Sequence, residues 1–79
     1  MKKFDHYEFA RELISDMERQ GLSDGAARLK SALDEGATGT EILMALRFSL
    51  AEIASNCPLP EQINAKANRL ILEINKALA

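Results

Sequence analysis

The stretch from Thr40 to Ala54, TEILMALRFSLAEIA, decides the fold that we expect for this chain. Helical geometry advances by about 100° per residue and gathers most of the apolar residues of this stretch on one broad face. The broad face contains Ile42, Leu43, Leu46, Leu50, Ile53 and Ala54. A second, narrower apolar stripe contains Met44, Phe48 and Ala51. A helix that is apolar on two sides is usually the buried centre of its domain or part of an interface. We therefore expect residues 40–55 to form the central helix.

The composition of the chain indicates an all-α protein. Leu, Ile and Ala are abundant, Val is absent and Thr occurs only twice. Strands favour β-branched and aromatic residues, whereas the Ile residues of this chain recur at helical spacing. Three further amphipathic segments lie at about residues 5–20, 24–35 and 60–77. We predict a single domain, residues 1–79, folded as a small antiparallel four-helix bundle with helix 40–55 in its centre.

Local sequence signals mark both ends of the first helix. Asp5 and Glu8 have the spacing of a capping box, and the carboxylates also suit the positive end of the helix dipole. Phe4 and Phe9 flank this cap at the spacing of a hydrophobic staple. Gly21 is expected to end the helix, because glycine adopts the left-handed conformation without a Cβ penalty.

Similar signals mark the starts of the other three helices. Ser23 is predicted to be the N-cap of the second helix, which is short and has a thin apolar face. Thr38 and Thr40 compete as the cap of the third helix, and Thr38 has capping-box spacing with Glu41. Pro60 suits the first position of the fourth helix, because proline has no amide hydrogen to leave unsatisfied there.

The charge pattern bears on location and on partners. The formal net charge is −2, with 10 basic and 12 acidic residues interspersed along the chain. Such a surface gives no electrostatic drive toward nucleic acid or anionic lipid. The longest apolar run, Ile42–Leu46, is far too short to cross a bilayer. A single cysteine cannot form an intramolecular disulfide. We therefore expect a cytoplasmic protein that does not insert into membranes.

His6 and Cys57 have the most reactive side chains of the chain, and neither has sequence neighbours that indicate chemistry. Base catalysis by His6 would need an adjacent nucleophile and an orienting partner. Cys57 has no adjacent cation to favour its thiolate form. We favour structural roles for both, with a Cys57–His6 pair as the alternative. The prediction is a non-enzymatic protein without a catalytic residue, a cofactor, a metal site or a small-molecule substrate.

The second and third helices can also be drawn as a helix-turn-helix, which would make the chain a nucleic-acid-associated regulator. The recognition helix of such a motif presents polar side chains to base edges. Helix 40–55 instead presents mainly apolar side chains, and Arg47 is its only cation. Pairing the first two helices offers Arg28 and Lys30 as the basic complement. Nucleic-acid binding therefore stands as the alternative function and is disfavoured on charge.

The apolar residues outside the main helix faces indicate where a partner would bind. Covering the second stripe of helix 40–55 requires neighbours wrapped around both of its sides, and the second helix contributes little apolar surface. Leu72 likewise falls outside the apolar face of its helix. Exposed apolar clusters tend to mark association sites, and C₂ homodimers are their commonest outcome. We predict a small protein–protein interaction module that forms a homodimer or binds one partner protein, with a monomer whose central helix is fully enclosed as the alternative. The predicted partner-binding residues are Met44, Phe48, Ala51 and Leu72.

Overall fold

The computed structural model of the protein describes residues 3–56 and 58–79 and contains four α-helices. These are α1 (His6–Arg19), α2 (Ser23–Glu35), α3 (Gly39–Asn56) and α4 (Glu61–Leu78). Of the residues that the structure describes, 83% are helical and none lies in a strand. Each helix begins and ends within one residue of its predicted bounds. The prediction of a small all-α four-helix bundle is confirmed.

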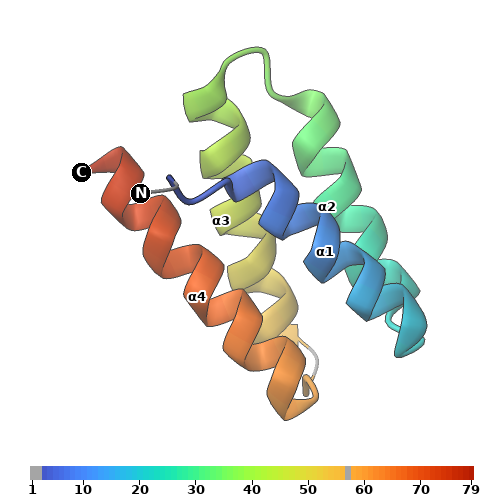
Figure 1. Cartoon of the computed structure of the whole chain (residues 1–79). Helices are drawn as coiled ribbons and strands as arrows, with labels where there is room; N and C mark the ends of the chain where they lie inside the picture. The colour runs from blue at the N-terminus through green and yellow to red at the C-terminus, as the bar shows by residue number, and fades with distance from the viewer. Residues whose placement is uncertain (1–2, 57) are drawn as a thin grey trace.

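Consecutive helices run in opposite directions (Figure 1). α1 packs against α2 and α4, and α3 packs against the same two helices on the other side of the core. All four helices supply buried side chains to one core cluster. Its fully buried large members are Leu13, Met17, Leu29, Leu46, Leu50, Leu70 and Ile74.

α3 was expected to be the central helix, but it occupies a position equivalent to that of α1. Both helices have α2 and α4 as their main neighbours. α3 buries Leu46, Leu50 and Ile53 in the core. Ile42 at the edge of its broad face is half-buried, and Ala54 is exposed. A square arrangement of four helices covers only the inner face of each one, so the core is shared among the helices rather than gathered around α3.

The predicted ends of α1 agree with the structure. The amide of Glu8 donates a hydrogen bond of 3.0 Å to Oδ1 of Asp5, the N-cap residue. The rings of Phe4 and Phe9 lie 5.1 Å apart between centroids, as a hydrophobic staple requires. Gly21 has a φ of 79°, the left-handed conformation that lets the chain leave the helix.

The starts of the other helices agree with the prediction in part. Thr38 caps α3 by accepting a 3.2 Å hydrogen bond from the amide of Glu41. Ser23, the predicted N-cap of α2, is instead its first helical residue, and the cap position belongs to Leu22 without a side-chain hydrogen bond. Pro60 lies at the N-cap of α4, one residue before the predicted position.

Gly36 is required by a close approach within the α2–α3 connection. A Cβ atom at this position would lie 2.4 Å from Cγ1 and 2.7 Å from the backbone nitrogen of Ile42. The backbone atom belongs to the first turns of α3 and cannot move aside like the end of a flexible side chain. A side chain at position 36 would therefore force the connection away from α3.

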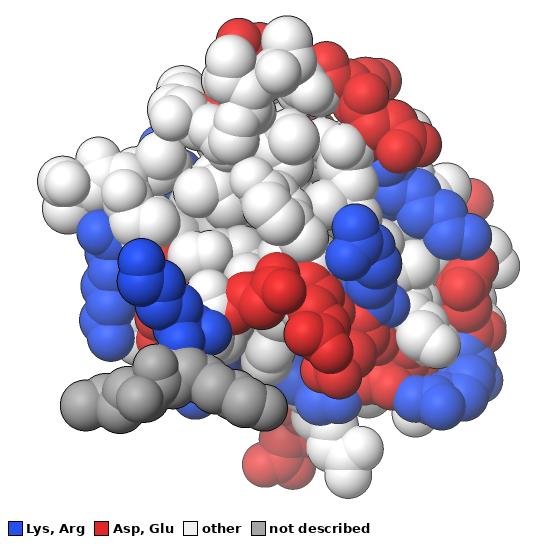
Figure 2. All heavy atoms as spheres, turned by 45° about the horizontal axis from the view of Figure 1, so that its top comes forward, with Lys and Arg blue, Asp and Glu red and all other residues white. Residues whose placement is uncertain are grey.

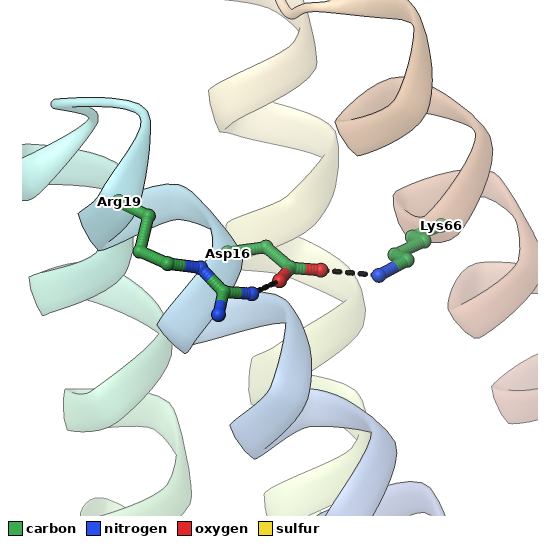
Figure 3. Close-up of polar contacts among 3 residues, drawn as sticks. All are labelled: Asp16, Arg19 and Lys66. Atoms are coloured by element: carbon green, nitrogen blue, oxygen red, sulfur yellow. Dashed lines mark hydrogen bonds and ion pairs between the residues drawn. The ribbon is translucent and has the colours of Figure 1, made fainter.

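A polar cluster joins α1 to α4 outside the core (Figure 3). The Asp16 carboxylate accepts hydrogen bonds from the Lys66 ammonium on α4 and from Arg19 one turn along α1. The bond from Lys66, assisted by Arg19 and opposed by partial desolvation, lowers the pKa of the Asp16 carboxyl below its ordinary value. The ionised form of Asp16 is therefore the form that this packing favours.

Candidate interaction surface

Three large hydrophobic side chains of the described residues are exposed. The exposed fractions are 67% for Phe48, 52% for Leu72 and 50% for Met44. Ala51 is exposed as well. The exposure of Phe48 follows from helical geometry, because a residue two positions away from a buried one lies about 200° around the helix. Since Leu46 and Leu50 are both buried, Phe48 between them faces outward.

Polar contacts on both flanks of α3 define the outer face of this helix. On one flank, Nη1 of Arg47 donates a 2.8 Å hydrogen bond to Oδ1 of Asn75 on α4. On the other flank, Nη1 of Arg28 on α2 lies 3.2 Å from each carboxylate oxygen of Glu52. The surface between these contacts is apolar and contains Met44, Phe48 and Ala51. This set is named the outer stripe.

Phe48 also borders a shallow groove between α2 and α3, with a volume of about 400 Å³. Small side chains line most of the groove, so the two helices leave a hollow beside the phenyl ring. Charged side chains from α2 and α3 complete the lining. The small residues are Ala27, Ser31, Ala32, Ala45 and Ser49, and the charged residues are Arg28, Glu35 and Glu52.

The groove was not predicted from the sequence, although a signal for it exists. Ala27 and Ser31 are four residues apart on α2, and Ala45 and Ser49 are four residues apart on α3. Residues at this spacing share one side of a helix. Two consecutive helices that each present a pair of small residues can form a groove where they meet, but the pairing of these sides becomes visible only in the folded chain.

Leu72 stands apart from the groove. It lies on α4, two residues from each of the buried residues Leu70 and Ile74, and therefore faces away from the core. It precedes Asn75, the partner of Arg47, by one helical turn. The structure thus brings Met44, Phe48 and Ala51 together on the outer face of α3 and leaves Leu72 on the neighbouring helix.

His6 has a structural contact in this fold. Its Nε2 atom lies 3.2 Å from the backbone carbonyl oxygen of Glu73, and a carbonyl can only accept, so this nitrogen carries the hydrogen. The rings of His6 and Phe4 form a T-shaped pair, with centroids 5.1 Å apart. The guanidinium of Arg69 lies 5.3 Å from the centre of the same Phe4 ring. These contacts tie the start of α1 to α4.

Three further features can be compared with the sequence: the cysteine, a metal site and a membrane span. Cys57 lies outside the described residues. Within residues 3–56 and 58–79, no group of three or more His, Cys, Asp or Glu side chains is placed to hold a metal ion. None of the helices in this part of the chain has both the length and the apolar character needed to cross a bilayer.

Charges of both signs are interspersed on the face shown in Figure 2, and an uncharged area occupies its upper centre. The two cations of α2 that a nucleic-acid site would use already contact carboxylates. Arg28 pairs with Glu52 of α3, and Nζ of Lys30 lies 2.7 Å from Oε2 of Glu18 on α1. Binding of phosphates by these side chains would have to compete with these ion pairs.

Comparison of the chain with known proteins gave no matching family model, no matching curated protein and no matching solved structure.

Proposed function

We propose that this protein is a non-enzymatic interaction module that binds another protein chain through the outer stripe of α3. The observation that carries the proposal is the 67% exposure of Phe48, in the middle of a helix that buries Leu46 and Leu50 on its opposite side. A phenylalanine at this position adds nothing to the core. Leaving it in water forgoes most of the stabilisation that burial of an aromatic side chain provides, about 1.5–3 kcal/mol.

The surroundings of Phe48 support a binding role. Met44 and Ala51 lie one turn before and about one turn after it, so the apolar area extends along the helix. The charged residues Arg28 and Glu52 border this area and provide a polar rim. Aromatic and methionine side chains surrounded by a polar rim are typical of protein-binding surfaces. Leu72 on α4 is proposed as a secondary contact of the same partner.

The proposed location is the cytoplasm. A single cysteine among 79 residues supports this location, because small domains that function outside the cell commonly depend on disulfides.

Mutation of Phe48 tests the proposal. The Phe48→Glu variant should retain the far-UV circular dichroism of the wild type and lose any stoichiometric protein partner, whether another protein or a second copy. The control is Gln62→Glu, which adds the same charge at an exposed position in the first turn of α4. This control should retain the partner. Unchanged partner binding by folded Phe48→Glu would refute the role of the outer stripe.

A further inference from the structure

We propose that the partner bound by the outer stripe is a cationic amphipathic helix, which packs apolar side chains against Phe48 and presents Lys or Arg side chains toward α2. This inference rests on the proposed function and names the kind of partner that the same surface would bind. The form of the surface favours a helix, and the unequal charges on its two flanks favour cations on one side of that helix.

The described part of the chain offers a partner side chains on helices and no sheet edge. Addition of a strand by the partner requires an exposed strand, and residues 3–56 and 58–79 contain none. Recognition of a proline-rich segment requires a groove lined by aromatic rings, whereas Phe48 is the only aromatic residue among the described residues that line the groove between α2 and α3. The remaining common mode places an amphipathic helix in a groove.

The dimensions of the surface suit a helix. Met44 and Ala51 are seven positions apart on α3, so the outer stripe is about 10 Å or two helical turns long. A partner helix that runs along the stripe can contact it with apolar side chains from successive turns, at positions i, i+3, i+4 and i+7. The groove of about 400 Å³ beside Phe48 provides a hollow for one edge of that apolar face.

The flank of the outer stripe that faces α2 is acidic. Glu52 lies on this flank, because Arg28 of α2 contacts it. Glu41 precedes Glu52 by eleven positions, which is about 20° around the helix, so it lies on the same flank. Glu35 of α2 also lines the groove. Arg28 neutralises Glu52, and two carboxylates remain.

These two carboxylates have no cation beside them. No ion pair within residues 3–56 and 58–79 involves Glu35 or Glu41. The Glu41 carboxylate accepts a 3.4 Å hydrogen bond from the hydroxyl of Thr38, which is a neutral group. Glu35 belongs to the last turn of α2, which has no basic residue, so its charge adds to the negative end of the helix dipole. Cations of a partner would therefore interact favourably with this flank.

The opposite flank of the outer stripe has the opposite charge. Arg47 lies about 140° around the helix from Glu52 and donates its hydrogen bond to the neutral side chain of Asn75 on α4. A partner with cations on both sides of its apolar face would meet a like charge at Arg47. The cations are therefore expected only on the side of the partner helix that faces α2.

Two synthetic peptides test the charge of the partner. Both are helices of about 14 residues, or four turns, with the same stripe of leucines; one has lysines along one flank, and the other has glutamates at the same positions. Fluorescence anisotropy at low salt should give a Kd about tenfold lower for the lysine peptide, because two contacts at the rim change from repulsion to attraction. The difference should shrink as the salt concentration rises.

Variants of the protein show which residues cause the preference. Glu35→Gln combined with Glu41→Gln should remain folded and bind both peptides equally, since glutamine also serves in a capping box and the end of α2 loses an unfavourable charge. The control combines Glu8→Gln with Glu12→Gln at exposed positions of α1, a helix whose main neighbours are α2 and α4. This control should keep the preference. Phe48→Ser should weaken the binding of both peptides.

Four outcomes would overturn the cationic helix. Equal affinity of the wild type for the two peptides, with both lost in Phe48→Ser, would exclude the charge preference and leave the proposed function in place. No binding of either peptide up to about millimolar concentration would exclude the helix, and the proposed function would still be tested by the protein partner of Phe48→Glu. Undiminished binding of both peptides by Phe48→Ser would place them on another surface. A wild-type dimer that Phe48→Glu dissociates and the lysine peptide does not would identify a second copy as the partner.

Discussion

Two leucines of α4 allow the packing of the bundle to be tested with the same substitution at neighbouring positions. Leu70 is 0% exposed and Leu72 is 52% exposed, although only one residue separates them. Truncation of a fully buried leucine to alanine costs about 2–5 kcal/mol, because both burial and packing contacts are lost. Truncation of a leucine that is half in water removes much less burial and should cost about 1 kcal/mol or less.

The consequence for the whole protein depends on its total stability. At about 0.05–0.15 kcal/mol per residue, a chain of 79 residues has roughly 4–12 kcal/mol of unfolding free energy. Leu70→Ala is therefore expected to remove a large share of the stability and to leave part of the population unfolded at the lower end of this range. Leu72→Ala should remain fully folded.

Urea unfolding followed by far-UV circular dichroism measures both effects. The midpoint should fall steeply for Leu70→Ala and little for Leu72→Ala, with a similar denaturant dependence in both variants. Equal losses in the two variants would refute the assignment of Leu72 to the outer surface of the protomer. Repeating the Leu72→Ala measurement at several protein concentrations separates the two causes of such a result, since a contribution from association depends on concentration and a core contribution does not.

Three further perturbations test other parts of the structure. Gly36→Ala should lower the melting temperature, because the added Cβ would meet the backbone of α3; an unchanged melting temperature would contradict that close approach. The pKa of Asp16 is lowered in the folded protein, so the unfolded chain binds the proton of this carboxyl more tightly than the folded protein does. The pair with Lys66 therefore stabilises the fold above the ordinary pKa of 3.8, and this contribution is lost as the pH falls through the lowered value. Asp16→Asn should therefore flatten the dependence of urea stability on pH in the acid range, and an unaltered dependence would show that Asp16 does not cause it. His6→Ala and Cys57→Ser should both retain partner binding, and loss of a measurable activity in both folded variants would instead support a Cys57–His6 pair.

The sequence alone determined the helices and most of their ends. Residues three or four positions apart lie on one helix face whatever the rest of the chain does, so the periodicity of Leu46, Leu50 and Ile53 predicted their burial. The cap of Asp5 and the turn at Gly21 also involve neighbours in the chain and agree with the structure. Ser23 departs from the prediction. Serine is a favoured N-cap residue, but α2 begins one residue earlier than expected, so Ser23 is its first helical residue.

The tertiary structure decided which apolar positions stay in water and which distant side chains meet. The exposure of Phe48 depends on α2 and α4 both covering the inner side of α3 and neither covering its outer side. Sequence periodicity identified the stripe but could not distinguish burial from exposure, because that depends on where the neighbouring helices lie. The groove between α2 and α3, with Arg28 and Glu35 at its ends, likewise exists only when the two helices pack at one particular register. Side-chain spacing along a helix is a local property, whereas a surface shared by two helices is set by the packing of the whole core.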